Sequence, residues 1–325
     1  MSPPTGSSSE EPLSGRVALI TGGSRGIGLE IARVLARAGA GIALIAKTDK
    51  PHPKLPGTIH EAADELRGLG AEVLPHVGDI RDETTVADAV ERTAAHFGGI
   101  DLCINNASAI DLTEVGAMPV KRFDLLQSVN VRGTFVTTSA CLPHLRSSGH
   151  PHVLTLSPPL NSERRWLRPA AYAVSKYGMT MVTLGVAEAE RPNRVGANCL
   201  WPLTGIATAA VRNLLGGSDA LAHSRTPAIV ADAAAAILRR DPGEYTGNAA
   251  IVEDVLAEEG ITDLAPYAHL PGQEAFMPDF FIDSARLGSD GVVEPEALPG
   301  LDGVGEADAL AGAAGEPPAP QRGRA

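Results

Sequence analysis

Short apolar runs rich in β-branched residues alternate with amphipathic segments along most of this chain. The runs are RVALITG, GIALIA, EVLPHVGD, IDLCINNA, HVLTLS, RVGANCL and NAAIV. After the first run, Ile27, Ile31, Val34, Leu35 and Ala38 recur at helical spacing and share one face. Strand followed by helix, repeated along the chain, predicts an α/β fold with a doubly wound parallel sheet of about seven strands and helices on both faces.

This sheet is expected to form a single domain over residues 13–284. At 325 residues, one α/β domain with two tails is the simplest arrangement. Residues 1–12 and 285–325 are rich in Pro, Gly and Glu and show no sustained apolar period, so we interpret both as disordered tails. A short docking helix around residues 306–314 is the alternative for the second tail.

The charge balance narrows the classes of partner. A formal net charge of −12 disfavours nucleic acid and anionic membranes, which are polyanions, and favours a small molecule. No apolar stretch approaches the ~20 residues of a membrane helix, and the N-terminus lacks the pattern of a signal peptide, so we expect a soluble, cytoplasmic protein. Cys103, Cys141 and Cys199 lie far apart inside apolar runs and are interpreted as core residues. The histidine spacing suggests no metal site.

A glycine-rich stretch, TGGSRGIG at residues 21–28, joins the first strand to the helix that follows. Glycines there allow a tight turn and a close approach of the backbone to a phosphate, and the helix N-terminus adds N–H groups and a partial positive charge. This position in a strand–turn–helix unit predicts a Rossmann-type site for the pyrophosphate of a dinucleotide. The residues assigned to it are Gly22, Ser24, Arg25, Gly26, Ile27 and Gly28.

Tyr172 and Lys176 stand four residues apart in a stretch that begins like a helix. A free tyrosine has a pKa of about 10 and is a poor proton shuttle at neutral pH. Residues i and i+4 lie on the same helix face, and a nearby ammonium favours the phenolate. The spacing therefore predicts an acid whose pKa is lowered by its neighbour.

The G-x-x-x-G-x-G spacing resembles the short-chain dehydrogenase/reductase family, and further motifs support the resemblance. NNAS at 105–108, NVRG at 130–133 and YAVSK at 172–176 are similar to family motifs and occur in the family's order. The stretches AKTDKPHPKLPGTI, SPPLN, WPLTGIATAA and MPDFFID look like one subgroup, that of hydroxysteroid dehydrogenase-like protein 2. The resemblance covers about residues 13–283 and implies a single Rossmann domain with oxidoreductase activity on CH–OH groups.

The resemblance also implies roles for individual residues. Tyr172 would donate a proton to a substrate carbonyl oxygen while NADPH delivers hydride to the carbon, and Lys176 would also hold the nicotinamide ribose. Asn130 would support a water chain that returns the proton. Asp79 would contact adenine, with a helix N-cap as its alternative role, and Asn106 would line the cofactor cleft.

The residues after the second strand bear on the choice of cofactor. An NAD-selective site usually has an acidic side chain there, but this chain has Ala46 and Lys47. Lys47 and Arg25 would offer two cations to a 2′-phosphate, so NADP(H) is the predicted cofactor. NAD(H) stays the alternative because Asp49 is near and because either cation could be a solvated surface charge.

The carbonyl-polarising serine of the family is displaced in this sequence. At the family's usual spacing before the tyrosine stands Pro159. Ser157, at the end of the strand, is our candidate, with Ser162 as the second choice and a plain turn serine as the alternative for both. The family's Pro-Gly after the sixth strand is also altered, and Thr204 or Thr208 is expected to meet the nicotinamide carboxamide.

The leading hypothesis is an NADP(H)-dependent oxidoreductase that acts on a small, apolar carbonyl or alcohol. A catalytically inactive nucleotide-binding sensor or scaffold is the rival, motivated by the irregular serine region, and an acidic tail that recruits a partner protein is a third idea. The stretch at residues 123–145 is apolar on more than one face, which predicts a homodimer or homotetramer. The substrate, the direction in the cell and the oligomeric state are not set by the sequence.

Overall fold

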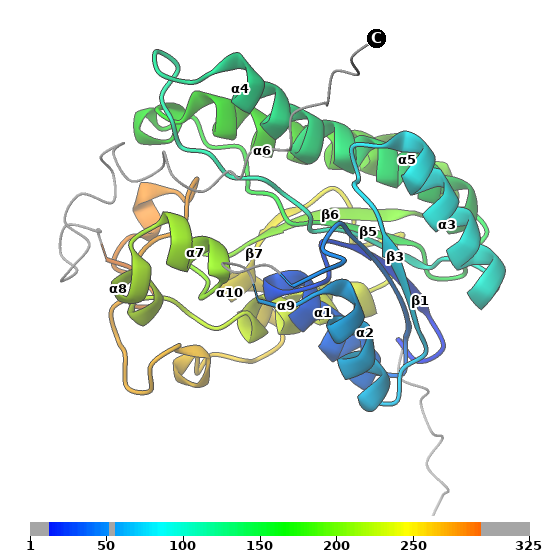
Figure 1. Cartoon of the computed structure of the whole chain (residues 1–325). Helices are drawn as coiled ribbons and strands as arrows, with labels where there is room; N and C mark the ends of the chain where they lie inside the picture. The colour runs from blue at the N-terminus through cyan, green and yellow to red at the C-terminus, as the bar shows by residue number, and fades with distance from the viewer. Residues whose placement is uncertain (1–12, 52–55, 294–325) are drawn as a thin grey trace, which may run out of the picture.

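A computed structural model describes residues 13–51 and 56–293 of the chain. Its core is a seven-stranded parallel sheet with the order β3-β2-β1-β4-β5-β6-β7 (Figure 1). The strands are Val17–Thr21 (β1), Gly41–Ala46 (β2), Val73–Val77 (β3), Leu102–Asn105 (β4), His152–Thr155 (β5), Gly196–Trp201 (β6) and Ala249–Ile251 (β7). Each of the seven apolar runs forms a strand, so the predicted doubly wound parallel sheet is confirmed.

Two layers of helices cover the sheet (Figure 1). One layer holds Gly26–Arg37 (α1), Ile59–Gly68 (α2), Ala228–Arg239 (α9) and Val252–Glu258 (α10). The other holds Glu83–Phe97 (α3), Val120–Leu126 (α4), the π-helical turn Gln127–Arg132 (η1), Gly133–Leu145 (α5) and Ala170–Ala189 (α6). Beyond the sheet edge lie Ala209–Leu214 (α7) and Gly217–Ala222 (α8), and the short 3₁₀ turns are Arg164–Leu167, Arg191–Asn193, Ala265–Tyr267 and Ser284–Arg286.

Burial explains why the strands read as unbroken apolar runs. All residues of β1 and β6 are buried because helices cover both faces of the sheet. Cys103, Cys141 and Cys199 are buried and free, which confirms their interpretation as core residues. Within the described ranges, no helix has the length and apolar character that crossing a bilayer requires.

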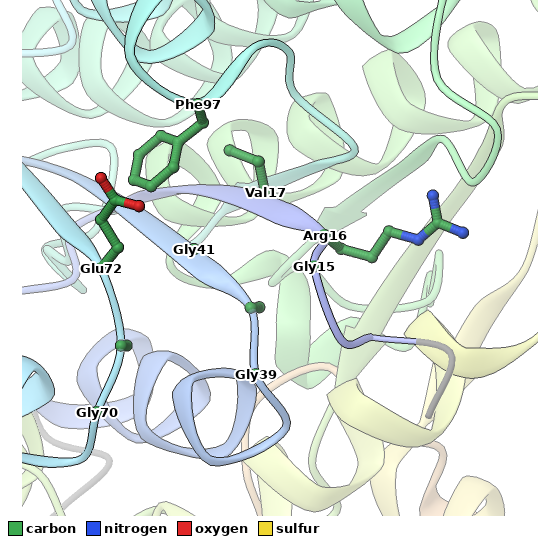
Figure 2. A pocket seen from close by; sticks show the side chains of 10 residues that line it. Gly15, Arg16, Val17, Gly39, Gly41, Gly70, Glu72 and Phe97 are labelled. Carbon is green, nitrogen blue, oxygen red and sulfur yellow. The ribbon is translucent and has the colours of Figure 1, made fainter. Parts of the chain in front are cut away.

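The strand order reverses between β1 and β4, which are neighbours although β2 and β3 intervene in sequence. Thr21 at the end of β1 pairs with Asn105 at the end of β4. In open α/β sheets, ligands bind outside the carboxyl ends of the strands at such a switch point. The surface hollow of Figure 2 lies at the opposite, amino-terminal end, where Arg16, Gly41 and Phe97 line it, so it is not the expected cofactor site.

Residues 276–293, which we call the C-terminal cover, fold against the end of β6. Met277 O accepts the N–H of Gly205 at 2.9 Å, and Phe276 N–H donates to Gly291 O at 2.8 Å. Val292 is fully buried. The predicted domain boundary at residue 284 therefore falls short, because residues 285–293 are held by the domain. The predicted tails over residues 1–12 and 294–325 lie outside the described residues.

Candidate active site

The glycine loop joins β1 to α1 at the carboxyl edge of the sheet. Gly22 and Gly26 have φ values of 69° and 56°, which side chains rarely adopt. A Cβ at Gly28 would lie 2.4 Å from Asn106 Nδ2 and 2.7 Å from Gly22 O. Asn106 Nδ2 itself donates to the carbonyl oxygens of Thr21 (3.0 Å) and Gly22 (3.1 Å). Asn106 thus locks the loop to the end of β4, and only glycine leaves room for it.

The N-terminus of α1 suits an anion. Arg25 is the N-cap residue of this helix, but within the described ranges its side chain makes no capping hydrogen bond. The first turn of the helix holds no acidic residue. The first backbone N–H groups of a helix need partners, and together with the helix dipole they favour a phosphate. Ser24 is buried in the same loop, Ile27 packs on the core, and a Cβ at Gly26 would lie 3.5 Å from Thr208 Cγ2. The predicted pyrophosphate residues therefore form one continuous turn.

The predicted 2′-phosphate residues lie at the end of β2 and in the glycine loop. Lys47 is exposed. Arg25 donates from its guanidinium to Gly57 O at 2.7 Å, and burial lowers its pKa from the usual value. Asp49, the residue that left NAD(H) open, faces His60 across 2.8 Å.

Asp79 lies at the start of the turn after β3. Its carboxylate accepts hydrogen bonds from the Arg81 guanidinium at 2.7 and 3.0 Å. Asp82, not Asp79, caps α3. The alternative role that the sequence left open for Asp79, a helix N-cap, is therefore wrong, and its adenine contact stays a prediction.

Asn130 sits in the π-helical turn η1, a distortion that is frequent at functional sites. Its Oδ1 accepts the N–H of Ala109 at 2.7 Å, and its Nδ2 donates to Ala109 O at 3.0 Å and to Ser175 Oγ at 2.9 Å. The residue is fully buried. Asn130 therefore ties the loop after β4 to α6, beside Lys176.

Tyr172 and Lys176 lie one turn apart on α6 and are almost fully buried, with exposed fractions of 5% and 2%. Lys176 Nζ donates to Leu156 O at 2.6 Å and lies 4.8 Å from the centre of the Trp201 ring. Leu156 follows β5 and Trp201 ends β6, so the pair stands at the carboxyl edge of the sheet.

The electrostatics of this pair differ from the sequence argument. Burial raises the pKa of Tyr172 above its ordinary value, and the charge of Asp279 adds to that effect. Burial also lowers the pKa of Lys176 to about 7, against the opposing influence of Asp279 and Cys199. In this structure the pKa of the phenol is therefore raised, not lowered as the sequence predicts, because burial disfavours the phenolate.

The two candidate serines occupy different surroundings. Ser157 is fully buried; its Oγ lies 3.0 Å from Thr180 Oγ1 and contacts the Cys199 thiol. Ser162 is exposed on the loop that leads to α6. Ser157 is thus held on the inner side of α6, and neither serine is linked to Tyr172 by a hydrogen bond within the described part of the chain.

The segment that follows β6 contains a buried polar group without a partner in the part of the chain that the structure describes. Thr204 is fully buried, and its Oγ1 has no hydrogen-bond partner among the described residues. Thr208 caps α7 by accepting the N–H of Val211 and flanks Gly26. Among the described residues, the unpartnered hydroxyl of Thr204 and the α1 N-terminus without a side-chain cap are polar groups that a bound dinucleotide could satisfy.

Sequence reasoning missed the aromatic side of the site. The rings of Phe280 and Phe281 lie 6.0 and 5.7 Å from the Tyr172 ring. Phe281 is fully buried and has a φ of 68°, which is unusual for a bulky residue and needs strong support from its surroundings. The only signal in the sequence was the MPDFFID stretch, which indicated a subgroup but not a location.

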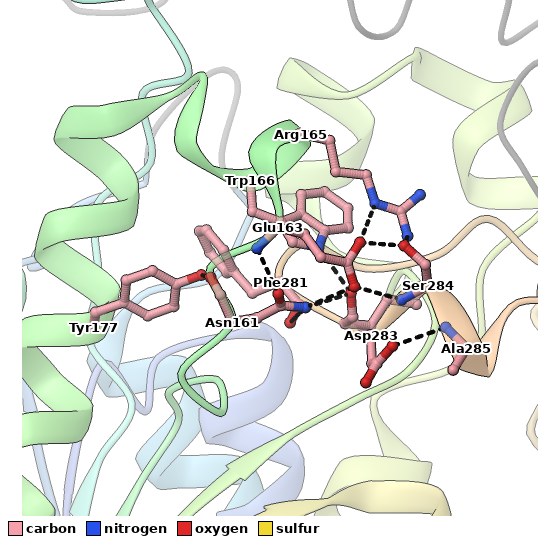
Figure 3. A network of polar contacts seen from close by, with 10 residues as sticks. Asn161, Glu163, Arg165, Trp166, Tyr177, Phe281, Asp283, Ser284 and Ala285 are labelled. Carbon is pink, nitrogen blue, oxygen red and sulfur yellow. Dashed lines mark hydrogen bonds and ion pairs between the residues drawn. The ribbon is translucent and has the colours of Figure 1, made fainter.

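Side chains that precede α6 hold this aromatic turn in place (Figure 3). Trp166 Nε1 and Asn161 Nδ2 donate to Ile282 O at 2.7 and 2.9 Å. Glu163 accepts the N–H of Ser284 at 2.8 Å. The C-terminal cover is therefore fixed on the loop before α6, and it closes the site above Tyr172.

Comparisons with known proteins agree with this arrangement. The short chain dehydrogenase family model matches residues 16–216. The hydroxysteroid dehydrogenase-like protein 2 of Xenopus tropicalis is 47% identical over 88% of this chain, and that of Danio rerio is 48% identical over 83%. The matches span 66% and 65% of those relatives' lengths.

Solved structures show the same fold. A short chain dehydrogenase from Mycobacterium thermoresistibile is 51% identical, with a TM-score of 0.80 over 85% of this chain and 98% of its own. Two more distant structures share the fold alone. Carveol dehydrogenase from Mycobacterium avium, in complex with NAD, is 21% identical with a TM-score of 0.64 over 74% of this chain and 97% of its own. L-sorbose reductase from Gluconobacter frateurii, complexed with NADPH, is 22% identical with a TM-score of 0.64 over 74% and 96%.

Proposed function

Because this chain belongs to the short-chain dehydrogenase/reductase family, we propose that it is an NADP(H)-dependent oxidoreductase that interconverts a carbonyl and a secondary alcohol. The observation that carries the proposal is the placement of Tyr172 and Lys176 at the carboxyl edge of the sheet. The same edge holds the glycine loop and the uncapped N-terminus of α1. A proton donor and the turn proposed to hold a dinucleotide therefore lie at the same edge of the sheet.

In the reducing direction, a bound nicotinamide supplies the hydride that forms the new C–H bond. Tyr172 donates its hydroxyl proton to the carbonyl oxygen, so the C=O double bond becomes a C–O–H single bond. Lys176, held by Leu156 O, keeps a positive charge beside the phenolate that remains. Asn130 fixes the position of the Ala109 backbone relative to Ser175, which lies next to Lys176 on α6. Solvent returns the proton to Tyr172.

The test uses purified protein with NADPH and a panel of ketones and aldehydes. At least one should be reduced, and Tyr172→Phe should lower kcat about 10²- to 10⁴-fold while leaving NADPH affinity unchanged. Tyr245→Phe, far along the chain from the site, is the matched control. Carbonyl reduction at full rate in Tyr172→Phe would contradict the assigned role of the phenol.

The preference for NADP(H) is supported by the exposed Lys47 at the end of β2 and by Arg25 in the glycine loop. The carboxylate of Asp49, the acidic residue near this position, is hydrogen-bonded to the His60 ring. An arrangement with cations at this position suits the 2′-phosphate better than the bare ribose hydroxyl.

A small, apolar substrate is supported by the apolar side chains around the phenol of Tyr172. Trp201, Phe280 and Phe281 surround the phenol of Tyr172. Val211, Leu215 and Leu221 of the neighbouring α7–α8 region form a further buried apolar cluster. Apolar walls favour a substrate that loses little hydration on entry.

A catalytically inactive nucleotide-binding sensor is the second candidate. The enclosed Ser157 and the deep burial of Tyr172 favour it, because both limit what a substrate can reach. The same experiment separates the two: tight NADPH binding without turnover of any member of the panel would support the sensor.

We also propose a homo-oligomer formed through α5 and α6. Phe135, Val174 and Met181 have exposed fractions of 57%, 55% and 57% on these helices. Exposed apolar side chains of this size on adjoining helices are typical of subunit interfaces. Size-exclusion chromatography with light scattering would measure the assembly.

A further inference from the structure

Asp279 belongs to the C-terminal cover and lies at the end of β6, near Tyr172 and Lys176. Its backbone N–H donates to Leu203 O at 2.8 Å, and its Oδ1 accepts the N–H of Phe280 at 2.6 Å. The residue is only partly exposed, as are its chain neighbours Pro278 and Phe280. Both the backbone and the carboxylate of Asp279 are therefore fixed at the edge of the active site.

A single indole connects this turn with the catalytic lysine. Trp201 Nε1 donates to Phe280 O at 2.7 Å, and the same ring lies 4.8 Å from Lys176 Nζ. The Phe280 ring meets the Tyr172 ring edge-on at 6.0 Å. Phe280, the residue after Asp279, therefore contacts both members of the pair. Its carbonyl oxygen binds the Trp201 ring that lies against Lys176, and its own ring packs on the Tyr172 ring.

The turn after Asp279 is held in an unusual conformation. Phe281 has a φ of 68° and is fully buried. A bulky residue adopts the left-handed region only where the surroundings enforce it, and such positions cluster at functional sites. Asn161 and Trp166 enforce it here by donating to the carbonyl oxygens of this turn.

Several ionisable groups face this cluster from different elements. Burial raises the pKa of Asp279 to about 7, against the opposing charge of Lys176 on α6. Cys199 on β6 also acts on Lys176. Glu253 on α10, whose carboxylate accepts the N–H of Leu203, raises the pKa of Asp279 further.

Arg225, which precedes α9, is a cation whose charge acts on Glu253. Its charge opposes the rise that burial causes in the pKa of Glu253. Its own guanidinium donates to Asp290 O at 2.6 Å and to Leu264 O at 3.3 Å. Arg225 therefore acts on the cluster through Glu253, and Asp279 is the carboxylate whose charge reaches both Lys176 and Tyr172.

We propose that Asp279 is a third titratable residue of the acid–base site, a positioning residue whose carboxylate keeps Lys176 in the ammonium form and opposes loss of the Tyr172 proton. This inference rests on the proposed dehydrogenase function. Asp279 transfers no proton itself; it maintains the phenol as a donor. The site is therefore biased toward carbonyl reduction, in which Tyr172 must begin the step protonated.

The first test needs no substrate. The chain has five lysines, so side-chain ¹³C NMR of ¹³C-lysine-labelled protein can follow Lys176, assigned by its loss in Lys176→Met. Asp279→Asn should lower the titration midpoint of Lys176 by about one pH unit, because a nearby carboxylate favours the ammonium. Asp283→Asn, an exposed acid of the same segment, should not move it, and Asp279→Glu should restore it. An unchanged or higher midpoint in Asp279→Asn overturns the proposal.

A second measurement on the unaltered protein protects against a variant that does not fold. The ¹³C-labelled carboxyl of Asp279 should titrate near pH 7. The same carboxyl resonance should also report the titration of Lys176, since the two charges interact, and a carboxyl signal with no step at the Lys176 midpoint overturns the proposal.

The third arm uses turnover. In Asp279→Asn, the falling limb of the reduction rate and the rising limb of the oxidation rate should both move to lower pH, by about one unit. The sign follows because the carboxylate of Asp279 disfavours the phenolate, so its loss eases deprotonation of Tyr172. Limbs that stay in place, or move upward, contradict the proposal. Absence of turnover in every protein, with the NMR shifts present, contradicts the proposed function and leaves the Asp279 assignment standing.

Discussion

The glycine loop and the C-terminal cover meet the same edge of the sheet but are built in different ways. The loop is short, and its shape depends on backbone conformation and on the absence of Cβ atoms at Gly22 and Gly28. The cover is held by side chains that donate to backbone carbonyls from distant parts of the chain; Asn161 and Ile282 are 121 residues apart.

This difference decides how each region responds to change. The loop lacks space, so adding one methyl group forces neighbouring atoms apart. The C-terminal cover is stabilised by close packing of large side chains, so truncating one of them leaves a cavity beside Tyr172 and Trp201. The cofactor end of the site should therefore be sensitive to enlargement, and the substrate end to truncation.

Phe281→Ala should produce the largest effect on stability. Phe281 is fully buried among Tyr172, Tyr177 and Trp201, so its removal should lower the free energy of unfolding by about 3–5 kcal/mol. Urea denaturation measures the change. Leu270→Ala, with a 48% exposed side chain outside the proposed subunit interface, is the control and should stay within about 0.5 kcal/mol of the unaltered protein. Equal effects would show that the cover is not packed as described.

Gly28→Ala should come next. The new Cβ would displace Asn106 from its hydrogen bonds to the loop, so we expect a loss of about 1–3 kcal/mol in unfolding free energy and weaker NADPH binding. Calorimetry and a fluorescence titration with NADPH measure these two quantities. At Gly99 a Cβ meets no atom within 4 Å, so Gly99→Ala should change neither. A Gly28→Ala protein that binds NADPH normally would remove the argument for close packing in the loop.

Lys47→Ala should have the smallest effect, confined to the cofactor. Loss of a charge-assisted contact with the 2′-phosphate should raise KM for NADPH about tenfold and leave KM for NADH nearly unchanged. Lys121→Ala, an exposed lysine on α4, serves as the control. The preference for NADP(H) fails if both cofactors are affected equally by Lys47→Ala.

Much of the cofactor side could be predicted because its chemistry resides in residue types at fixed spacing. A glycine at residue 28 and an apolar stripe on the following helix suffice to place a strand, a tight turn and a helix N-terminus. Tyr172 and Lys176 could be placed on one helix face for the same reason. Ser157 could be placed at the end of its strand, but not on one side of α6, because its distance from Tyr172 along the chain says little about which side it faces.

The sequence by itself determined the order of strands and helices, the turn that suits a phosphate, and the pairing of a phenol with an amine on α6. These depend on local periodicity and on properties of single residue types. Only the tertiary structure decided the acid–base character of that pair and the role of residues 276–293. Burial and the approach of Asp279 set the pKa values of Tyr172 and Lys176, and both arise from contacts between segments far apart in the chain. Desolvation depends on everything that surrounds a group, and no local pattern encodes it.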